Sequence, residues 1–412
     1  MKKYLISIIL ILSILFSATG CADEITYATT VEEIVVTEEI LKPESDIVDT
    51  VPVTEETTTE TDIPVDETYQ ETDDTIIDNE SGEDITTETV FEETTTEVVT
   101  EEETEPAPKT FDFVVTFTGD VMLASYKDQT TSGSFNEYVN NNDPSYFFEK
   151  MKPIFEQDDY TIVNLENVFT DNKLTEVWKD HDPAYWYKSK TSNTEILTSS
   201  SIEAVSLANN HYGDYGTQGR RDTDAAVESA GLLYGHNDKT FYIEKNGFTI
   251  AVICHGLWSG WQADQIIERI NAEEEKSDFQ IVFYHGGTER IHKPEDWKVK
   301  ASRKLVDAGA DLVVGNHPHV LQPIETYNGV DIIYSMGNFC FGGSKRPENR
   351  TIVYQLKLTI NNDNQIEAKV GEIIPCYVYT GSINNYQPAP VDDETIKQKI
   401  LDFMYGKINS PV

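Results

Sequence analysis

The sequence predicts an α/β fold in which one layered domain follows a long disordered segment. Three observations lead to this prediction. From Phe111 onward, apolar runs typical of strands alternate with helical patterns. Two antiparallel strand pairs are predicted near the carboxyl end, where strand patterns flank short turns. Before Phe111 the chain is acidic and rich in threonine, without sustained periodicity.

Residues 1–21 have the organisation of an export signal. Lys2 and Lys3 form a charged start, and an apolar run from Tyr4 to Ala18 follows. This run is shorter than the roughly 20 residues that a membrane-spanning helix needs. It ends in Ala-Thr-Gly-Cys, which resembles a bacterial lipoprotein processing site, so we expect cleavage before Cys21 and lipidation of its thiol. A plain secretory peptide cut nearby is the alternative.

Residues 22–109 are predicted to form a disordered tether. They contain 30 acidic residues, two lysines and 21 threonines, with few aromatic residues. Such a chain cannot bury enough apolar area to offset its loss of conformational entropy, and its charges repel one another. Because the whole chain has a net charge of −42, we do not expect nucleic acid as a partner. The predicted role is a solvated spacer that holds the domain away from a membrane.

The domain is predicted over residues 110–385, and strands alternate with helices along most of it. Apolar β-branched runs predict strands, and apolar residues spaced three and four apart predict helices. In the first half, strands are predicted at 113–118, 160–165, 203–208 and 248–254, and helices at 144–157, 217–230 and 263–276. In the second half, strands are predicted at 279–284 and 311–314, with a helix at 297–308 between them.

The last part of the chain is predicted to add antiparallel strands and a closing helix. Strands at 324–327 and 332–335 flank Asn328-Gly329, a strong hairpin signal. A second pair, at 352–360 and 365–373, turns at residues 361–364. A helix at 394–405 lies within the predicted C-terminal segment, residues 386–412.

Three cysteines follow Cys21, namely Cys254, Cys340 and Cys376. An odd number in an exported domain cannot pair fully, so no disulfide framework is predicted. Each lies in or beside an apolar run, which is typical of a small buried side chain.

Residues with metal-binding chemistry follow the predicted strands, one set after another. They are Asp120, Glu166, Asn210 with His211, His285, and His317 with His319. Since the carboxyl ends of parallel strands share one edge of a sheet, these side chains are expected to meet in one cleft. Imidazole, carboxylate and amide groups bind divalent cations, so the sequence predicts a metal centre. Each residue taken alone could instead cap a turn or face solvent.

The charges of this set predict its chemistry. Two divalent cations would bring four positive charges, while Asp120 and Glu166 return two negative charges and the imidazoles return none. The positive excess could hold an anionic substrate oxygen and lower the pKa of water toward about 7. A carboxylate such as Glu166 could bridge the ions, and His211 could protonate a leaving group.

Short motifs that carry these residues occur in the order of a known family. They are Thr118-Gly119-Asp120, Asn164-Leu165-Glu166, Ala208-Asn209-Asn210-His211 with Asp214 and Gly216, His285-x-Gly287-x-Glu289, Gly315-Asn316-His317-Pro318-His319 and Tyr334-Ser335-Met336-Gly337-Asn338-Phe339. Over about residues 111–345 the chain resembles the CapA family of poly-γ-glutamate capsule synthesis proteins, related to the calcineurin-like metallophosphoesterases. The resemblance implies a four-layer α/β/β/α sandwich and a centre of two divalent metal ions.

The resemblance also implies roles for individual residues. Those similar to metal ligands are Asp120, Glu166, Asn210, His285, His317 and His319, with His211 as the acid beside them. Asp214 and Glu289 are expected either to orient His211 and His285 or to be solvated loop carboxylates. The wider phosphoesterases carry a histidine two residues after the first aspartate, where this chain has Met122, so one metal would lose a ligand.

Together these features predict a lipid-anchored protein outside the cytoplasm. It would act with membrane machinery on an anionic polymer such as poly-γ-glutamate, by metal-assisted hydrolysis or transfer. Two alternatives stay open. One is a non-catalytic, metal-dependent binding or assembly factor, which Met122 favours, and the other is a cell-surface phosphoesterase or nucleotidase.

Overall fold

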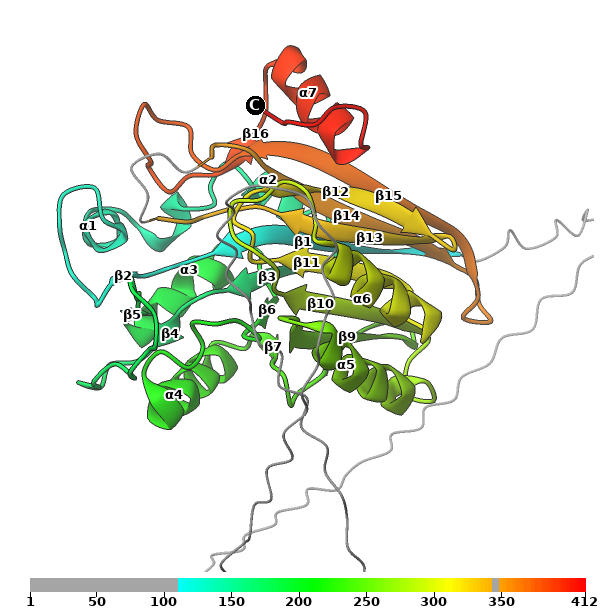
Figure 1. The fold of residues 1–412 in the computed structure, drawn as a ribbon, viewed down its shortest axis with the longest axis horizontal. Coiled ribbons are helices and arrows are strands. Elements are labelled where there is room, and N and C mark those ends of the chain that lie inside the picture. The colour runs from blue at the N-terminus through cyan, green and yellow to red at the C-terminus, as the bar shows by residue number, and fades with distance from the viewer. Residues whose placement is uncertain (1–109, 343–347) are drawn as a thin grey trace, which may run out of the picture. The chain divides into compact units, whose positions relative to one another are not determined.

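The structure is a computed structural model that describes residues 110–342 and 348–412. The described residues form the predicted four-layer α/β/β/α sandwich: two β-sheets face each other, and helices cover the outer face of each sheet (Figure 1). The predicted export signal, its lipidation site Cys21 and the predicted tether lie outside the described residues.

The first sheet has seven strands in the order β16-β15-β14-β1-β3-β6-β7. Their bounds are β1 Phe111–Val121, β3 Tyr160–Leu165, β6 Ala204–Ser206, β7 Leu233–Gly235, β14 Thr351–Ile360, β15 Ile366–Tyr377 and β16 Ala389–Pro390. Strands β1, β3, β6 and β7 are parallel, so their carboxyl ends share one edge. The strands from β14 to β16 join antiparallel on the other side of β1.

The second sheet has six strands in the order β12-β13-β11-β10-β9-β8. Their bounds are β8 Phe241–Lys245, β9 Phe248–Gly256, β10 Phe279–His285, β11 Leu312–Asn316, β12 Leu321–Tyr327 and β13 Val330–Met336. Strands β9, β10, β11 and β13 are parallel. The predicted hairpin between β12 and β13 is confirmed, with φ of 51° at Asn328 and 80° at Gly329. Positive φ at both positions is what a two-residue hairpin turn requires.

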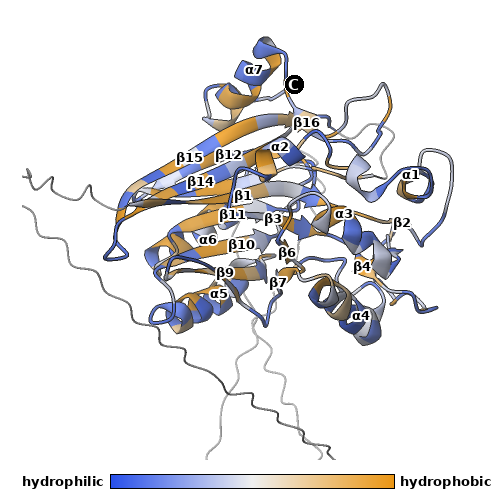
Figure 2. Ribbon diagram, turned by 180° about the vertical axis from the view of Figure 1, so that it is seen from behind, coloured by the Kyte–Doolittle hydropathy of each residue, from blue (hydrophilic) through white to orange (hydrophobic). Residues whose placement is uncertain are grey.

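Alternation along the strands builds the core between the sheets. Phe113, Val115 and Phe117 of β1 point toward the second sheet and are fully buried. They meet residues such as Ile281 and Phe283 of β10, which come from the opposing face. The hydropathy colouring shows apolar residues concentrated along these strands (Figure 2). Burial of these faces is the main force that holds the sheets together.

Helices form the two outer layers. Over the second sheet lie α5 (Gly260–Glu273) and α6 (Asp296–Asp307), which pack on β10, β11 and β13. The apolar cluster on the outer face of the first sheet draws on α1 (Phe135–Asn141), α2 (Lys152–Phe155), α3 (Glu195–Thr198) and α4 (Gly216–Ser229). A last helix, α7 (Glu394–Met404), packs on β12 and β15 and adds Ile400 and Phe403 to the core between the sheets.

The predicted helix over residues 144–157 is wrong. The structure has a short 3-10 turn, η1 (Pro144–Tyr146), followed by turns and the four-residue helix α2. Pro153 explains the break, because it has no N–H to donate and its ring collides with the carbonyl four residues earlier. Proline is tolerated only in the first turn, which is where α2 places it. The apolar spacing that predicted the helix nevertheless holds, since Phe147, Met151 and Phe155 are buried.

Other predictions concern cysteines and the membrane. Cys254, Cys340 and Cys376 are all buried with free thiols, which confirms the prediction for these residues. None of the helices in the described ranges combines the length and the apolar character that crossing a bilayer requires.

Candidate metal centre

The predicted site residues lie where parallel strands of both sheets end. Asp120 is the residue before the last of β1, and Glu166 directly follows β3. From the second sheet, His285 ends β10, while His317 and His319 follow β11. The loop after β6 brings Asn210 and His211 to the same place, where Asn210 Oδ1 lies 2.8 Å from His285 Nε2. The predicted meeting of these side chains at one edge is therefore what the structure contains.

Strand alternation explains why Glu166 and His285 face the space between the sheets. Ile162 of β3 faces this space, so two and four residues later Asn164 and Glu166 do as well. His285 follows Phe283 in the same way on β10. Neither side chain needs special loop geometry to reach the site.

Asp120 reaches the site because β1 is irregular. The pairing of β1 with β3 shifts register between Phe117 and Asp120, so β1 contains one extra residue there. A bulge of this kind re-aims the following side chains. Before the bulge, the odd-numbered residues Phe113 and Phe117 face the second sheet. After the bulge, the even-numbered residue Asp120 faces this sheet as well.

Asp120 joins the two sheets. Its Oδ1 accepts a hydrogen bond of 2.8 Å from Asn164 Nδ2 on the first sheet. Its Oδ2 accepts from the backbone N–H of His317 at 3.3 Å and lies 3.1 Å from His319 Nδ1. The backbone N–H of Asp120 also donates to the carbonyl of Gly337, beyond β13, at 2.8 Å.

Gly119 allows this close approach of the two sheets. A Cβ atom at this position would lie 2.1 Å from the carbonyl oxygen of Gly337. Real Cβ atoms do not approach backbone oxygens so closely, so any other residue must push β1 and the loop after β13 apart. The glycine of the Thr-Gly-Asp motif is therefore explained by packing.

Three imidazoles form a cluster on the second-sheet side. His285 Nε2 lies 3.0 Å from His317 Nδ1, and the rings of His317 and His319 have centroids 5.5 Å apart. His317 and His319 have φ of 99° and 57°, conformations that side-chain-bearing residues rarely adopt. Strained backbone of this kind is concentrated at functional sites, where the surrounding structure enforces it.

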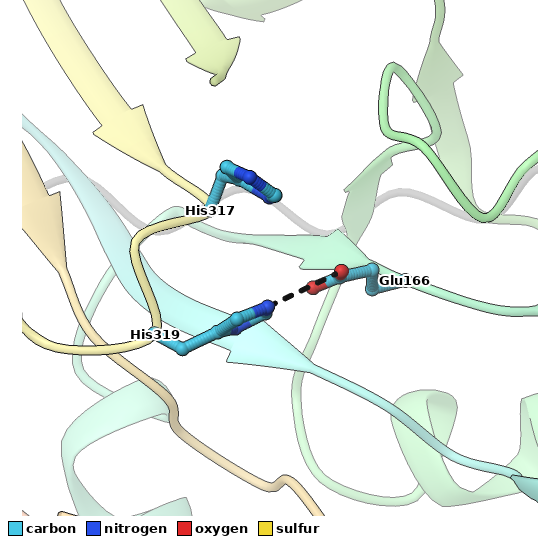
Figure 3. A group of neighbouring side chains, drawn as sticks. All are labelled: Glu166, His317 and His319. Carbon is cyan, nitrogen blue, oxygen red and sulfur yellow. Dashed lines mark ion pairs between the residues drawn. The ribbon is translucent and has the colours of Figure 1, made fainter. Parts of the chain in front are cut away.

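Glu166 lies at the centre of these groups. Its side chain is fully buried, and neither carboxylate oxygen has a hydrogen-bond partner among the described residues. Its Oε1 lies 3.7 Å from His285 Nε2, 3.8 Å from His211 Nε2 and 3.9 Å from His319 Nε2. Figure 3 shows the carboxylate of Glu166 directed toward the ring of His319, with His317 across from them.

These separations fit a bound cation. They are too long for hydrogen bonds but shorter than twice the roughly 2.1 Å bond between a divalent metal and its ligand. One ion could therefore bond both the carboxylate and an imidazole. Two groups have ligand atoms within 4.8 Å of one another, Glu166 with His317 and His319, and Asp120 with Glu166 and His285. A buried carboxylate without donors is costly unless such an ion compensates it.

Burial and charge shift the pKa values in opposite directions across the site. Burial raises the pKa of the Glu166 carboxyl well above its ordinary value, and the charge of His319 only partly opposes this. Burial alone would lower the pKa of His319, but the carboxylates of Glu166 and Asp120 raise it to about 9. Both shifts mean that this pair holds a proton more tightly than either group does in water.

The other two imidazoles are held neutral. Burial lowers the pKa of His285 and His317 well below the ordinary value, and the neighbouring imidazoles add to the effect. Lys298 is fully buried near them, with Nζ donating to the Gly286 carbonyl at 3.1 Å and to Gln322 Oε1 at 2.8 Å, and burial lowers the pKa of this lysine to about 7. Neutral imidazole is the form that binds metal ions.

His211 is positioned by a carboxylate on its far side. Its Nδ1 donates to Asp214 Oδ2 at 2.8 Å, so its Nε2 points toward Glu166. Asp214 is itself fully buried and is held by Lys179 Nζ at 2.7 Å and by the backbone N–H of Tyr187 at 2.8 Å. Burial lowers the pKa of His211, and the bond to Asp214 opposes this shift.

Glu289 and Met122 lie differently from the other predicted residues. Glu289 is exposed, and the structure of the described residues gives it no hydrogen bond or ion pair to His285. Instead Asn164 and Asn210 contact the two nitrogens of that ring. Met122 is buried in a small apolar cluster with Ala124 and Phe341, so its position offers no nitrogen or oxygen ligand.

Several residues support the site without having been assigned a role from the sequence, although Asn164 and Asn338 lie within its motifs. Asn164 Nδ2 lies 3.1 Å from His285 Nδ1 and also donates to Asp120, while Asn338 Oδ1 lies 3.0 Å from His319 Nδ1. The indole of Trp258 packs edge-on against His317, with centroids 4.8 Å apart. Alternation with Glu166 could have indicated Asn164, but nothing in the sequence indicates the indole.

Comparison with known proteins agrees with the resemblance indicated by the sequence motifs. Residues 114–343 match the family model described as bacterial capsule synthesis protein PGA_cap. The chain is 31% identical over 310 residues to the PGA biosynthesis protein CapA of Bacillus subtilis (strain 168), an alignment that covers 69% of this chain and 76% of that protein. It is 27% identical over 314 residues to the capsule biosynthesis protein CapA of Bacillus anthracis, covering 69% of this chain and 71% of that protein.

Proposed function

Because the chain belongs to the bacterial capsule synthesis protein family, we propose that it acts in making, exporting or attaching an anionic capsule polymer, poly-γ-glutamate. The relatives named for PGA and capsule biosynthesis support this role. The finer proposals concern a metal-dependent reaction and a position at the cell envelope.

One observation carries the metal-dependent part of the proposal. Glu166 is a fully buried carboxylate without a donor, and three imidazoles surround one of its oxygens at 3.7–3.9 Å. Residues that would hold divalent ions, two in our proposal, are Asp120, Glu166, Asn210, His285, His317 and His319. When bound, such ions supply Lewis-acid polarisation of a substrate oxygen and activation of water.

His211 is the proposed proton donor to the leaving group. Asp214 fixes the ring through Nδ1, which leaves Nε2 directed at the site as the atom that gives or takes a proton. The contact with Asp214 also stabilises the charged form that precedes proton donation. The proposed reaction is hydrolysis of, or transfer from, the polymer.

The proposed location is the cell envelope, with the protein anchored outside the cytoplasm by a lipid on Cys21. The sequence of residues 1–21 supports lipidation, and the acidic residues 22–109 support a spacer between membrane and domain. The proposed partners are the membrane and the polymer synthesis machinery. The capsule-related names of the relatives agree with this location.

Met122 favours a second candidate function. It lies where the wider phosphoesterases have a histidine, and its side chain belongs to an apolar cluster. With fewer ligands the second ion would be held weakly, which suits a non-catalytic factor that binds the polymer through a metal.

Turnover of γ-glutamyl oligomers by the metal-loaded full chain separates the two candidates. The proposal predicts turnover that falls by about 10²–10⁴-fold in His211→Ala, while the exposed His181→Ala variant behaves like wild type. Binding of the oligomers without any turnover would support the assembly factor instead. Equal turnover by wild type and His211→Ala would contradict the proton-donor role.

A further inference from the structure

A groove of about 650 Å³ lies beside the metal centre. Its volume falls within the range of about 300–1,000 Å³ that is common for ligand sites. One wall comes from β2 (Ser125–Tyr126) and β5 (Tyr187–Ser189), which form a small sheet with β4 (Val168–Phe169), and another comes from the loop between β15 and β16. Strand β2 and helix α1 lie on this side of the strand ends (Figure 1).

Tyrosines dominate this wall. Tyr126 of β2 pairs with Tyr187 of β5, and Tyr185 lies two residues before Tyr187, so all three side chains are brought to the groove. The rings of Tyr185 and Tyr187 are nearly parallel, with an angle of 13° and centroids 6.4 Å apart. Tyr379 and Tyr386 line the groove from the opposite loop.

Most of these hydroxyl groups have no protein partner. Among the described residues, the hydroxyls of Tyr185, Tyr187 and Tyr379 make no hydrogen bond, whereas that of Tyr386 donates to the Gly133 carbonyl at 3.1 Å. The hydroxyl of Tyr126 contacts the side chain of Lys127 and helps to raise the pKa of that lysine. Tyr126 and Tyr185 are also 38% and 46% exposed, which is high for large aromatic side chains. The wall therefore presents aromatic faces together with unused donors and acceptors.

The groove and the metal centre share residues. The ring of Tyr187 lies edge-on to His211 with centroids 4.8 Å apart, and its backbone N–H donates to Asp214. Ala124, another lining residue, belongs to the apolar cluster of Met122 and Phe341, and Phe341 packs on His319 at 4.8 Å. A ligand in the groove would therefore extend to the edge of the metal centre.

The described residues that line the groove carry no charge. No described residue that lines it is acidic or basic, and the polar lining consists of hydroxyls and amides such as those of Ser134, Gln129 and Asn384. Three lysines of the neighbouring segments have contacts of their own: Lys179 pairs with Asp214, and Lys188 lies 4.8 Å over the ring of Tyr215. Lys127 pairs with Glu176, and its Nζ lies 5.6 Å from the centre of the Tyr126 ring.

A polyanion is a poor fit for such a surface. The domain carries an excess of acidic residues, so repeated carboxylates would be repelled at long range and would find no cation among the described lining residues of the groove. A neutral chain avoids both penalties. Tyrosine, serine and asparagine together offer rigid aromatic contact area and adaptable hydrogen bonds, which suits a chain that alternates C–H faces with hydroxyls.

We propose that this groove binds a neutral oligosaccharide next to the metal centre. Its sugar rings would pack on Tyr126, Tyr185 and Tyr187, and its hydroxyls would bond the free phenolic groups. Binding in the groove goes beyond the proposed function and does not depend on it. Only the further step, in which the saccharide is the acceptor or anchor for the polymer handled at the metal centre, rests on that function.

Isothermal titration of the full chain with defined oligomers tests the proposal. The probes are a tetramer of β-1,4-linked N-acetylglucosamine, a tetramer of β-1,4-linked glucose and a tetramer of γ-linked glutamate. We expect at least one neutral tetramer to bind, and Tyr126→Ala and Tyr185→Ala each to weaken its binding about tenfold. Tyr405→Ala, which changes an exposed tyrosine at the C-terminal end of α7 that does not line the groove, is the matched control and should bind as wild type does.

Three outcomes would overturn the proposal: no binding of either neutral tetramer, equal binding by all variants, or groove-dependent binding of the glutamate tetramer alone. Thermal unfolding of each variant checks that the fold is kept, as the exposure of both tyrosines predicts. Metal content and γ-glutamyl turnover are measured on the same samples. Sugar binding without turnover would uphold the groove and reject the enzymatic function, and turnover without sugar binding would do the reverse.

Discussion

The two sheets contribute different chemistry to the site they share. The first sheet supplies both carboxylates, Asp120 and Glu166, while the second supplies the imidazoles of His285, His317 and His319. Both groups of residues that could hold an ion, Glu166 with His317 and His319, and Asp120 with Glu166 and His285, combine carboxylates of the first sheet with imidazoles of the second. The difference shows that the centre depends on the packing of the sandwich and not on any single loop.

The halves also respond to burial in opposite ways. Burial raises the pKa of Glu166 and lowers the pKa of His285 and His317. In each case burial disfavours the charged form. A divalent ion between the halves would favour the charged form of Glu166 and would bind the imidazoles in their neutral form.

Removing a ligand from either half is expected to have the largest effect. Metal at a hundredfold excess over its Kd should raise the free energy of unfolding by about 2.7 kcal/mol, and Glu166→Gln or His317→Ala should each abolish most of this gain. If both halves bind the same ions, as we propose, the double variant should lose little more than either single variant. Unfolding in urea with and without metal measures this.

Glu203→Gln is a suitable control, since Glu203 precedes β6 at the other end of the same sheet. In the metal-free protein Glu166→Gln should be no less stable than wild type, because it removes a buried carboxylate without donors. Fully additive losses in the double variant would mean that the two halves work independently.

Forcing the halves apart should have the next largest effect. Gly119→Ala places a methyl group 2.1 Å from the Gly337 carbonyl, so we expect a loss of at least about 2 kcal/mol in the free energy of unfolding. Weaker metal binding should accompany it, because Asp120 moves with β1. Gly260→Ala, at the open start of α5, should cost nothing. Equal unfolding midpoints for both variants would refute the packing role of Gly119.

Substitutions of Asp214 and Glu289, the two carboxylates predicted to orient histidines, should have smaller effects, and these effects should differ. Asp214→Asn removes the partner of His211 Nδ1, so the pKa of His211 should fall further and turnover should drop about 10–100-fold. Glu289→Gln should change stability by less than about 0.5 kcal/mol, because the side chain is exposed. Histidine resonances followed by NMR through a pH titration distinguish these outcomes. An unchanged pKa of His211 in Asp214→Asn would count against the contact.

Counted per pH unit, the smallest effect is a pH dependence of the metal-free protein. His319 has a pKa of about 9 in the folded protein, above its ordinary value of 6.5, so the folded state retains a proton that the unfolded state releases. Stability should therefore fall as pH rises from about 6.5 to 9, by at most about 1.4 kcal/mol per pH unit for one proton. His319→Gln should flatten this slope, and so should added metal. A slope that is the same in wild type and His319→Gln would contradict the assignment.

Much of the site could be predicted from the sequence because strands alternate. The period of two that places Phe283 in the core also places His285 in the cleft, and the same holds for Ile162 and Glu166. The rule that ligands bind at the carboxyl ends of parallel strands then brings these residues together. No knowledge of the loops is needed for this part.

Other parts could not be predicted, for identifiable physical reasons. The extra residue in β1 that turns Asp120 inward is a property of its pairing with β3, which is a long-range contact. Strands β2 and β4 have two residues each, too few to show a period. The groove is formed by segments far apart in the chain, among them Tyr126 and Tyr386, so no local pattern indicates it.

Metal content after reconstitution tests most directly whether the carboxylate half and the imidazole half form one centre. The full chain is loaded with divalent metal, freed of excess ions and analysed by elemental analysis, in parallel with Glu166→Gln, His317→Ala and His181→Ala. We predict that wild type and His181→Ala retain metal, whereas substitution in either half causes its loss. Retention of the full metal content by both Glu166→Gln and His317→Ala, or no uptake by wild type, would contradict a shared centre.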